Sequence, residues 1–153
     1  FASPNYYSGM TSLTRAFFER WFQFRHRGVD LVWGKLAIVI GVGSVSGEAP
    51  ADEMEKMLTY NYVKVIEKIA LKGNPSCYYC GFGNVCEVGI PKLTGIECPP
   101  RDKIPDILDN PEDRMMLEKS AKKFVSYLND GYDRRLTILE MQQTLLEKFS
   151  ETV

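Results

Sequence analysis

All four cysteines of the chain lie in one short segment, between positions 77 and 98. Their spacing is C-x2-C-x5-C-x11-C. A C-x2-C pair can direct two sulfurs at one centre, and four thiolates close together suit tetrahedral zinc or an iron–sulfur cluster. The second half of the segment lacks the C-x2-C form of a zinc knuckle and ends in Cys98-Pro99, which favours iron–sulfur. The predicted metal ligands are Cys77, Cys80, Cys86 and Cys98.

The same cysteines could serve other purposes than holding an iron–sulfur cluster. Zinc could fix the loop, or Cys77 and Cys80 could form a redox dithiol, although C-x2-C alone is a weak motif. Two disulfides would suit a secreted chain, but these residues show no signal-peptide pattern. We therefore expect the protein to work in a reducing cytoplasm. Gly81 and Gly83 are expected to bend the backbone, often with positive φ, and to turn amides toward sulfur.

Charge and composition exclude several classes of function. The 153 residues suit one domain, with 19 Lys and Arg against 20 Asp and Glu, a formal net charge of -1. This balance, without a basic stripe, argues against a nucleic-acid partner. His26 is the single histidine, which argues against hydrolytic triads and histidine-rich metal sites. No run of residues is apolar enough for a membrane span.

Two apolar runs predict the strands that must position these residues. Residues 36–42 (LAIVIGV) are almost wholly apolar, which is typical of a strand buried on both faces of a parallel sheet. Residues 63–71 indicate a mixed strand nearer an edge, and Phe1-Ala2 resembles a strand end. Because two strands and a stub do not form a stable sheet, we expect a missing N-terminal half or a partner chain to complete it. Residues 1–153 alone are then not expected to fold stably.

Helices are predicted from apolar spacing and from cap residues. The expected ranges are 11–25, 50–62, 111–130 and 134–149, with Leu13, Phe17, Trp21 and Phe24 on the apolar stripe of the first and Leu117, Ala121, Phe124, Val125 and Leu128 on that of the third. The domain organisation expected is α/β: half of a sheet domain over 1–75, a cysteine-rich metal-binding segment and linker over 76–105, and C-terminal helices over 106–153.

A loop rich in Gly and Ser, residues 41–47, follows the carboxyl end of the first apolar strand. Ligands of open α/β sheets bind in the crevice outside the carboxyl ends of the strands, so this loop is a candidate binding element. Its spacing is not the G-x-G-x-x-G of dinucleotide-binding loops. A plain strand-to-helix turn explains the glycines about as well.

The opening residues S-P-N-Y-Y-S-G-M, followed by a helix with F-F-E-R-W, resemble the loop and helix after the third strand of NAD(P)H-dependent FMN reductases, in the flavodoxin-like superfamily. Ser3-Pro4 matches the strand exit, Tyr6 the aromatic position and Met10 the apolar anchor. The Gly-Ser loop stands where the second flavin loop of that family stands. The cysteine run is similar to the tail of an iron–sulfur-linked subgroup. The resemblance covers about residues 1–130.

This resemblance implies a doubly wound parallel sheet of order 2-1-3-4-5 with FMN at its carboxyl edge. The implied FMN-binding residues are Ser3, Pro4, Asn5, Tyr6, Tyr7, Ser8, Gly9 and Met10 in the first loop and Gly43, Ser44, Val45 and Gly47 in the second. The family holds the FMN phosphate in the loop after its first strand, which is not among these residues. Iron–sulfur flavoproteins carry their cysteine motif earlier in the chain.

The function expected from these observations is an FMN reductase-like oxidoreductase that passes electrons between FMN and an iron–sulfur cluster in the cytoplasm. NAD(P)H or a redox protein would be its partner. The protein would act as a homo-oligomer or as a subunit of a larger complex. One alternative is a structural or interaction subunit with a zinc site and a vestigial flavin site. Another is a quinone or nitro-compound reductase that uses flavin alone.

Overall fold

The computed structural model describes residues 1–26 and 31–150, and its centre is a three-stranded parallel sheet. The strands are β1 (Ala2–Pro4), β2 (Leu36–Gly43) and β3 (Lys64–Lys72), in the order β1-β2-β3. Both neighbouring pairs are parallel. The predicted α/β class is confirmed, and so are both apolar strands, the first as the central strand and the second at an edge.

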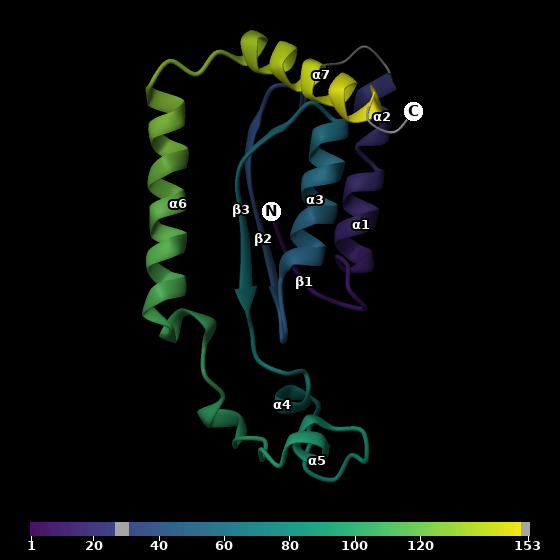
Figure 1. Ribbon diagram of the computed structural model, residues 1–153, viewed down its shortest axis with the longest axis vertical. Coiled ribbons are helices and arrows are strands. Elements are labelled where there is room, and N and C mark those ends of the chain that lie inside the picture. The colour runs from purple at the N-terminus through teal and green to yellow at the C-terminus, as the bar shows by residue number, and fades with distance from the viewer. Residues whose placement is uncertain (27–30, 151–153) are drawn as a thin grey trace.

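The core lies between the sheet and two helices on one of its faces. α3 (Glu48–Tyr60) connects β2 to β3 and packs beside α1 (Ser12–Glu19) (Figure 1). Side chains alternate along a strand, and every second residue of β2 is buried on this face. Val39 of β2, with Met54 and Leu58 of α3, is completely buried. The loop that follows β2 is therefore anchored to the best-packed part of the molecule.

The first predicted helix is divided in the structure, which corrects its predicted apolar face. α1 ends at Glu19, and α2 (Phe22–His26) begins after a turn. Leu13, predicted on the apolar stripe, is 81% exposed, whereas Phe18, predicted beside it, is 2% exposed and belongs to the core. Both residues lie before the break, so packing of α1 buries the neighbouring face, which carries Phe18. Beyond the break, a stripe calculated for one continuous helix no longer stays on one face.

The opposite face of the sheet has thinner cover. α6 (Pro111–Asn129) lies on that side (Figure 1) and begins, as predicted, after the N-cap Asn110, whose side chain accepts from the Glu112 amide at 3.0 Å. Ser120 is its only buried residue among those described. The predicted stripe is wrong for Ala121, Val125 and Leu128, which remain exposed. Intervening residues of β2 on this face are only half-buried.

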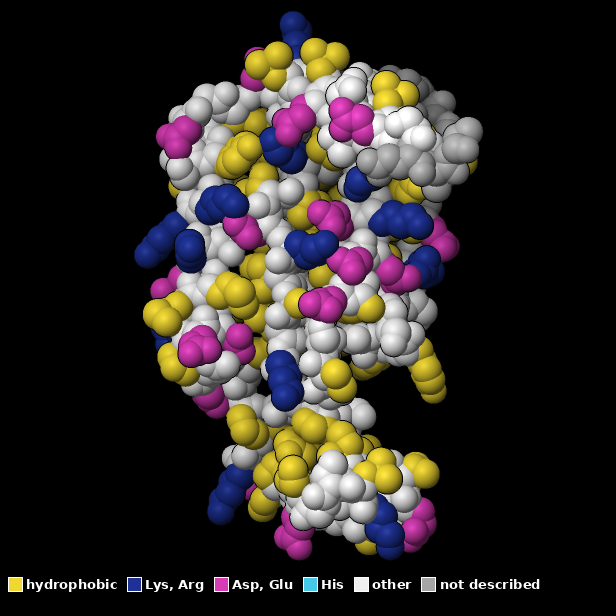
Figure 2. All heavy atoms as spheres, in the orientation of Figure 1, with side chains coloured by type: hydrophobic (Ala, Val, Ile, Leu, Met, Phe, Trp, Pro, Cys, Tyr) yellow, Lys and Arg dark blue, Asp and Glu magenta, His cyan; other side chains and the backbone are white. Residues whose placement is uncertain are grey.

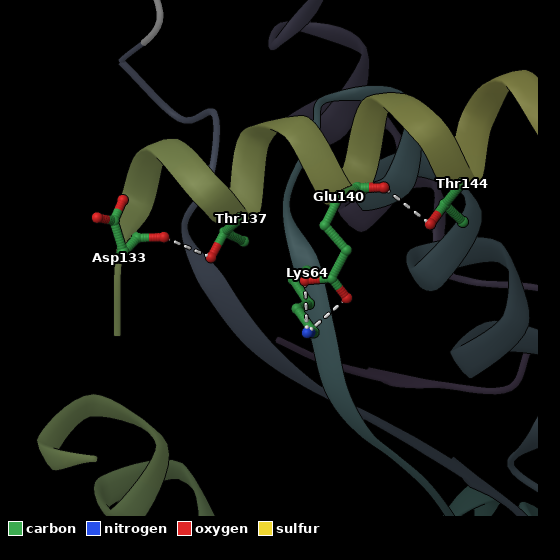
Figure 3. A network of polar contacts seen from close by, with 5 residues as sticks. All are labelled: Lys64, Asp133, Thr137, Glu140 and Thr144. Carbon is green, nitrogen blue, oxygen red and sulfur yellow. Dashed lines mark hydrogen bonds and ion pairs between the residues drawn. The ribbon is translucent and has the colours of Figure 1, made fainter. Parts of the chain in front are cut away.

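α7 (Arg134–Ser150) crosses the amino-terminal end of the sheet (Figure 1). Its Met141 and Leu145 side chains are buried. Lys64 of β3 binds both carboxylate oxygens of Glu140, at 2.6 and 2.8 Å (Figure 3). The remaining elements, α4 (Cys77–Cys80), α5 (Ile90–Thr94) and the 3-10 turns η1 (Arg101–Lys103) and η2 (Ile107–Asp109), lie beyond the other end of the sheet. None of the helices in the described ranges is long and apolar enough to cross a membrane.

The ion pair between Lys64 and Glu140 predicts a pH-dependent contribution to stability. Burial lowers the pKa of Lys64, but hydrogen bonds to Glu140 and Tyr127 outweigh it and raise the pKa above 10.5. A raised folded-state pKa gives stability that is complete below the unfolded value and is lost as pH rises through the folded value. Because Glu140 is half exposed, we expect Lys64→Gln to lower the free energy of unfolding by about 0.5–1 kcal/mol at neutral pH.

Urea unfolding of Lys64→Gln beside an exposed control, Lys122→Gln, measures this effect. The difference between Lys64→Gln and wild type should shrink above about pH 10.5, where the unfolded-state lysine loses its proton. The same difference at neutral and strongly alkaline pH would show that the charge of Lys64 contributes nothing.

Candidate functional site

A cavity of about 990 Å³ lies at the carboxyl ends of the three strands. The loop after β1 contributes Pro4, Asn5, Tyr6 and Tyr7, the end of β2 contributes Val42, Gly43 and Ser44, and the residues after β3 contribute Gly73 and Asn74. Parallel strands end at the same edge of a sheet, so three loops far apart in the sequence meet here. This is the edge at which open α/β sheets bind ligands.

The other wall of the cavity comes from the cysteine segment and from the residues that follow it. Its residues are Ser76, Tyr79, Arg101, Ile104, Pro105, Asp106 and Ile107. Asn74 joins the two walls, because its amide nitrogen donates to the Pro105 carbonyl at 2.6 Å and to the Tyr79 hydroxyl at 3.1 Å. The cavity therefore lies between the sheet edge and the cysteine segment.

Six of the twelve residues predicted to bind flavin line this cavity: Pro4, Asn5, Tyr6, Tyr7, Gly43 and Ser44. Ser8, Gly9, Val45 and Gly47 lie in the same loops but not on its wall. Ser3 and Met10 have internal roles instead. The Ser3 hydroxyl is buried and accepts from the Thr11 amide at 3.1 Å. Met10 is a core residue, and its amide donates to Glu53 at 2.7 Å.

The first loop presents its tyrosines on a strained turn. Tyr6 and Gly9 exchange two backbone hydrogen bonds, of 3.0 and 3.2 Å. Tyr7 and Ser8 between them have φ of 52° and 58°. Such values are unfavourable for residues other than glycine, and strained backbone of this kind clusters at ligand-binding sites. Tyr6 is 64% exposed and Tyr7 is fully exposed, so both rings are available to a ligand.

The glycines of the second loop are explained by close packing. A Cβ atom on Gly47 would lie 1.9 Å from the carbonyl oxygen of Gly41. The loop is also tied to the first loop, because the Asn5 amide nitrogen donates to the Ser46 carbonyl at 2.9 Å. In the part of the chain that is described, the amides of Ser44 and Val45 have no hydrogen-bond partner in the protein. These amides can therefore face a ligand or solvent.

Asn5 leaves one polar atom without a partner. Its Oδ1 is buried and accepts no hydrogen bond from the described residues, although the residue lines the cavity. A buried acceptor without a partner is uncommon in folded proteins and costs about 1–3 kcal/mol. A bound ligand or water that donates to Oδ1 would remove this cost.

The cysteine segment brings its sulfurs around one piece of backbone. The thiols of Cys80 and Cys98 donate to the Cys77 carbonyl, at 3.5 and 3.4 Å. Two amides donate to sulfur at 3.4 Å, from Phe82 to Cys80 and from Ile90 to Cys77. Amide hydrogen bonds to sulfur are among the features that tune thiolate-bound clusters.

Two further contacts fold the segment onto itself. Gly83 is buried, and a Cβ atom on it would lie 2.4 Å from the Cys98 sulfur, so only glycine allows this approach. Its φ is not positive, which corrects the prediction, whereas Gly81 has the predicted positive φ of 80°. The Cys98 amide donates to the Asn84 side chain at 2.8 Å. Cys98 is thereby held near the first cysteine pair despite the eleven-residue gap.

All four cysteines are free thiols, and no disulfide joins them. Burial raises the pKa of the Cys98 thiol, and the neighbouring Cys77 and Cys80 raise it further. Over the described residues, no three Cys, His, Asp or Glu side chains are arranged closely enough to hold a metal ion as they stand. The donor types still suit zinc or iron, and a C-x2-C pair on one turn can converge by side-chain rotation.

The cysteine segment has no apolar core of its own. Tyr78 and Ile90 are half-buried, and its other large hydrophobic side chains are exposed. Figure 2 shows hydrophobic side chains gathered on the lobe that the segment forms at the bottom of the view. The exposed residues are Tyr79, Phe82, Val85, Val88, Leu93 and Ile96. Small units that cannot bury a core depend on disulfides, metals or a partner for stability. This favours a cross-link through the four cysteines or a covering partner.

Sequence reasoning missed Asn74, Arg101 and Glu53. Asn74 lies just beyond the end of β3, so its position at the carboxyl edge could have been predicted. Arg101 lies far from any strand end in sequence, and no pattern marks it. Glu53 also binds Arg15 at 2.5 Å, a contact across 38 residues that only the tertiary structure shows.

No model of a known protein family, no curated protein and no solved structure matches this chain.

Proposed function

We propose that this chain is part of a flavodoxin-like redox protein that binds FMN and passes electrons between the flavin and a metal centre in the cysteine segment. One observation supports it above the others: a single cavity is lined by both predicted flavin loops and by Tyr79, which lies between Cys77 and Cys80. The predicted flavin loops therefore lie beside the segment that carries the predicted metal ligands, although no cysteine lines the cavity itself.

Each wall would serve the flavin in a different way. Tyr6 and Tyr7 offer rings for stacking against a flat aromatic ligand. The amides of Ser44 and Val45 and the unpartnered Asn5 oxygen offer hydrogen bonds to its polar edge. Bound flavin accepts a hydride and releases electrons singly, while the protein orients it and limits solvent access.

The four cysteines would hold the metal centre as thiolates. Binding would replace the thiol contacts to the Cys77 carbonyl, whereas the amides of Phe82 and Ile90 would go on donating to sulfur. The lack of a core in this segment supports a role for metal in its folding. Iron–sulfur is the cofactor that we propose, with zinc as the alternative.

The sheet offers a place for further strands. β1 pairs on one side only, with β2, within the described ranges. The half-buried apolar residues on the α6 side of β2 are also unusual, because parallel sheets are normally covered on both faces. We propose that strands from elsewhere in the protein, or from a partner chain, extend the sheet beside β1. NAD(P)H or a redox protein would supply or remove electrons in the cytoplasm, in a homo-oligomer or larger complex.

Anaerobic purification of the complete protein, followed by metal analysis and a visible spectrum, tests the function. We expect bound FMN, with the flavin absorption bands, and iron with the broad absorption of a cluster. Flavin without metal would favour a reductase that uses flavin alone. Absence of both flavin and iron would refute the proposal.

A second candidate is an interaction subunit in which zinc fixes the cysteine segment. The six exposed hydrophobic side chains on this segment favour it, because exposed apolar patches mark protein interfaces. Zinc with no flavin and no iron in the same metal analysis would support this candidate.

Replacing Tyr6 with Ala is expected to weaken FMN binding by about 1–3 kcal/mol, the scale of aromatic stacking on a planar base. The residue is exposed, so the fold should be unaffected. Fluorescence titration with FMN measures the affinity. Tyr6→Phe, which keeps the ring, should bind like wild type. Equal FMN affinity in Tyr6→Ala and Tyr6→Phe would remove this ring from the site.

A further inference from the structure

The cavity at the sheet edge has two charged residues on its wall, Arg101 and Asp106. Asp106 is engaged in the chain itself, because its Oδ1 accepts from the Leu108 amide at 2.9 Å and starts η2. The Arg101 guanidinium has neither a hydrogen bond nor an ion pair with the described residues. The cavity wall therefore carries one positive charge without a partner among the described residues, and one carboxylate, Asp106, whose Oδ1 is occupied by the backbone.

The rest of the wall is neutral. Its polar groups are tyrosine hydroxyls, amides and serine hydroxyls, and the remainder is apolar. A guanidinium presents several donors in a plane and binds phosphate or carboxylate through two parallel hydrogen bonds. Aromatic rings on one loop and a single free guanidinium on another suit a ligand with a planar ring system and one anionic group.

The segment that carries Arg101 is held in place against the cavity. η1 begins after Pro99-Pro100, and these prolines limit the backbone freedom of the residues that lead into Arg101. Four residues beyond Arg101, the Pro105 carbonyl accepts the 2.6 Å hydrogen bond from Asn74 at the sheet edge. Arg101 is an exposed residue, but the linker that carries it is fixed at the sheet edge.

We infer that Arg101 pairs with the anionic group of the ligand in this cavity and makes the site selective for FMN over its neutral analogue riboflavin. This inference rests on the proposed flavin function. The anion would then be recognised by a residue of the linker that follows the cysteine segment. No sequence pattern points to a residue of this linker, and the resembled family holds the phosphate in a different loop, so this pairing departs from the family.

Arg101→Gln in the complete protein tests the inference, with FMN and riboflavin as probes in fluorescence titrations. The control is Lys103→Gln, which removes a positive charge from the same turn at a residue off the cavity wall. Loss of a charged hydrogen-bond pair predicts about a 10- to 100-fold weaker FMN affinity in Arg101→Gln. Riboflavin affinity should stay unchanged, and Lys103→Gln should behave like wild type with both probes.

The outcomes separate this inference from the proposed function. If wild type binds both flavins and Arg101→Gln keeps the same preference for FMN, or weakens both equally, the pairing with the anion is refuted and the flavin function stands. If wild type binds neither flavin, the flavin function fails and the inference fails with it. If Arg101→Gln and Lys103→Gln weaken FMN equally, the effect is a general one of charge, which also refutes a specific pairing.

Discussion

Serine in place of Cys77, Cys80 or Cys86 is expected to abolish metal uptake by the protein. These residues are joined by short gaps, and Cys77 and Cys80 already lie on one helical turn, α4. The segment buries no large hydrophobic side chain, so a closed thiolate site would supply folding free energy that nothing else in the segment provides. Iron and zinc content, measured for each single variant after anaerobic purification, tests the prediction.

Cys98 is expected to behave differently from the first three. Its amide stays bound to Asn84 whichever side chain it carries, so the backbone should keep its course. Cys98→Ser is expected to retain a partly assembled or oxygen-labile centre. Val85→Ser is the matched control, because it introduces serine at an exposed position of the same segment and should keep the full metal content. Full metal content in all four cysteine variants would show that the segment is not a metal site.

Alanine in place of Gly47 is expected to be the most destabilising substitution in the loops around the cavity. The added Cβ atom would lie 1.9 Å from the Gly41 carbonyl oxygen and 2.8 Å from the Val42 amide nitrogen. Both are backbone atoms, so no side-chain rotation can relieve the clash. Overpacking inside proteins costs about 1–3 kcal/mol and occasionally more, and we expect a loss of about 3 kcal/mol in the free energy of unfolding.

Chemical denaturation of Gly47→Ala against Gly131→Ala measures this cost. Gly131 has a positive φ of 91°, but a Cβ atom added to it would meet no neighbouring atom within 4 Å. Its substitution therefore isolates the cost of placing alanine in a left-handed backbone conformation, about 1–2 kcal/mol. Equal loss of stability in the two variants would mean that the loop shifts freely and that β2 and α3 do not hold it.

Local properties of the sequence determined most of the secondary structure. The run at 36–42 is almost wholly apolar, which is typical of a central parallel strand with both faces covered. The start of α6 was equally predictable, because Asn110 and Pro111 suit the first residues of a helix through their own backbone geometry. The convergence of loops at the carboxyl edge also followed, since it depends only on the strands being parallel.

The position of the first helix's core face depended on tertiary packing. Spacing alone favoured Leu13 and Phe17, but α1 packs on the sheet through the neighbouring face and buries Phe18 instead. The exposed face of α6 has a similar cause: an apolar stripe is buried only where a sheet or helix lies opposite, and the stripe itself does not reveal that. Val125 and Leu128 have no such cover.

The candidate site was also predicted in part from the sequence, while its remaining residues were revealed only by the tertiary structure. Tyr6, Tyr7, Gly43 and Ser44 were assigned to the flavin through the family resemblance, and they line the cavity. Ser3 and Met10 were assigned in the same way, but packing turns them inward. Arg101 and Asn74 reach one cavity from positions 27 residues apart only through the path of the cysteine segment back to the sheet. That path depends on contacts between distant residues, such as Asn74 with Pro105, which no local pattern encodes.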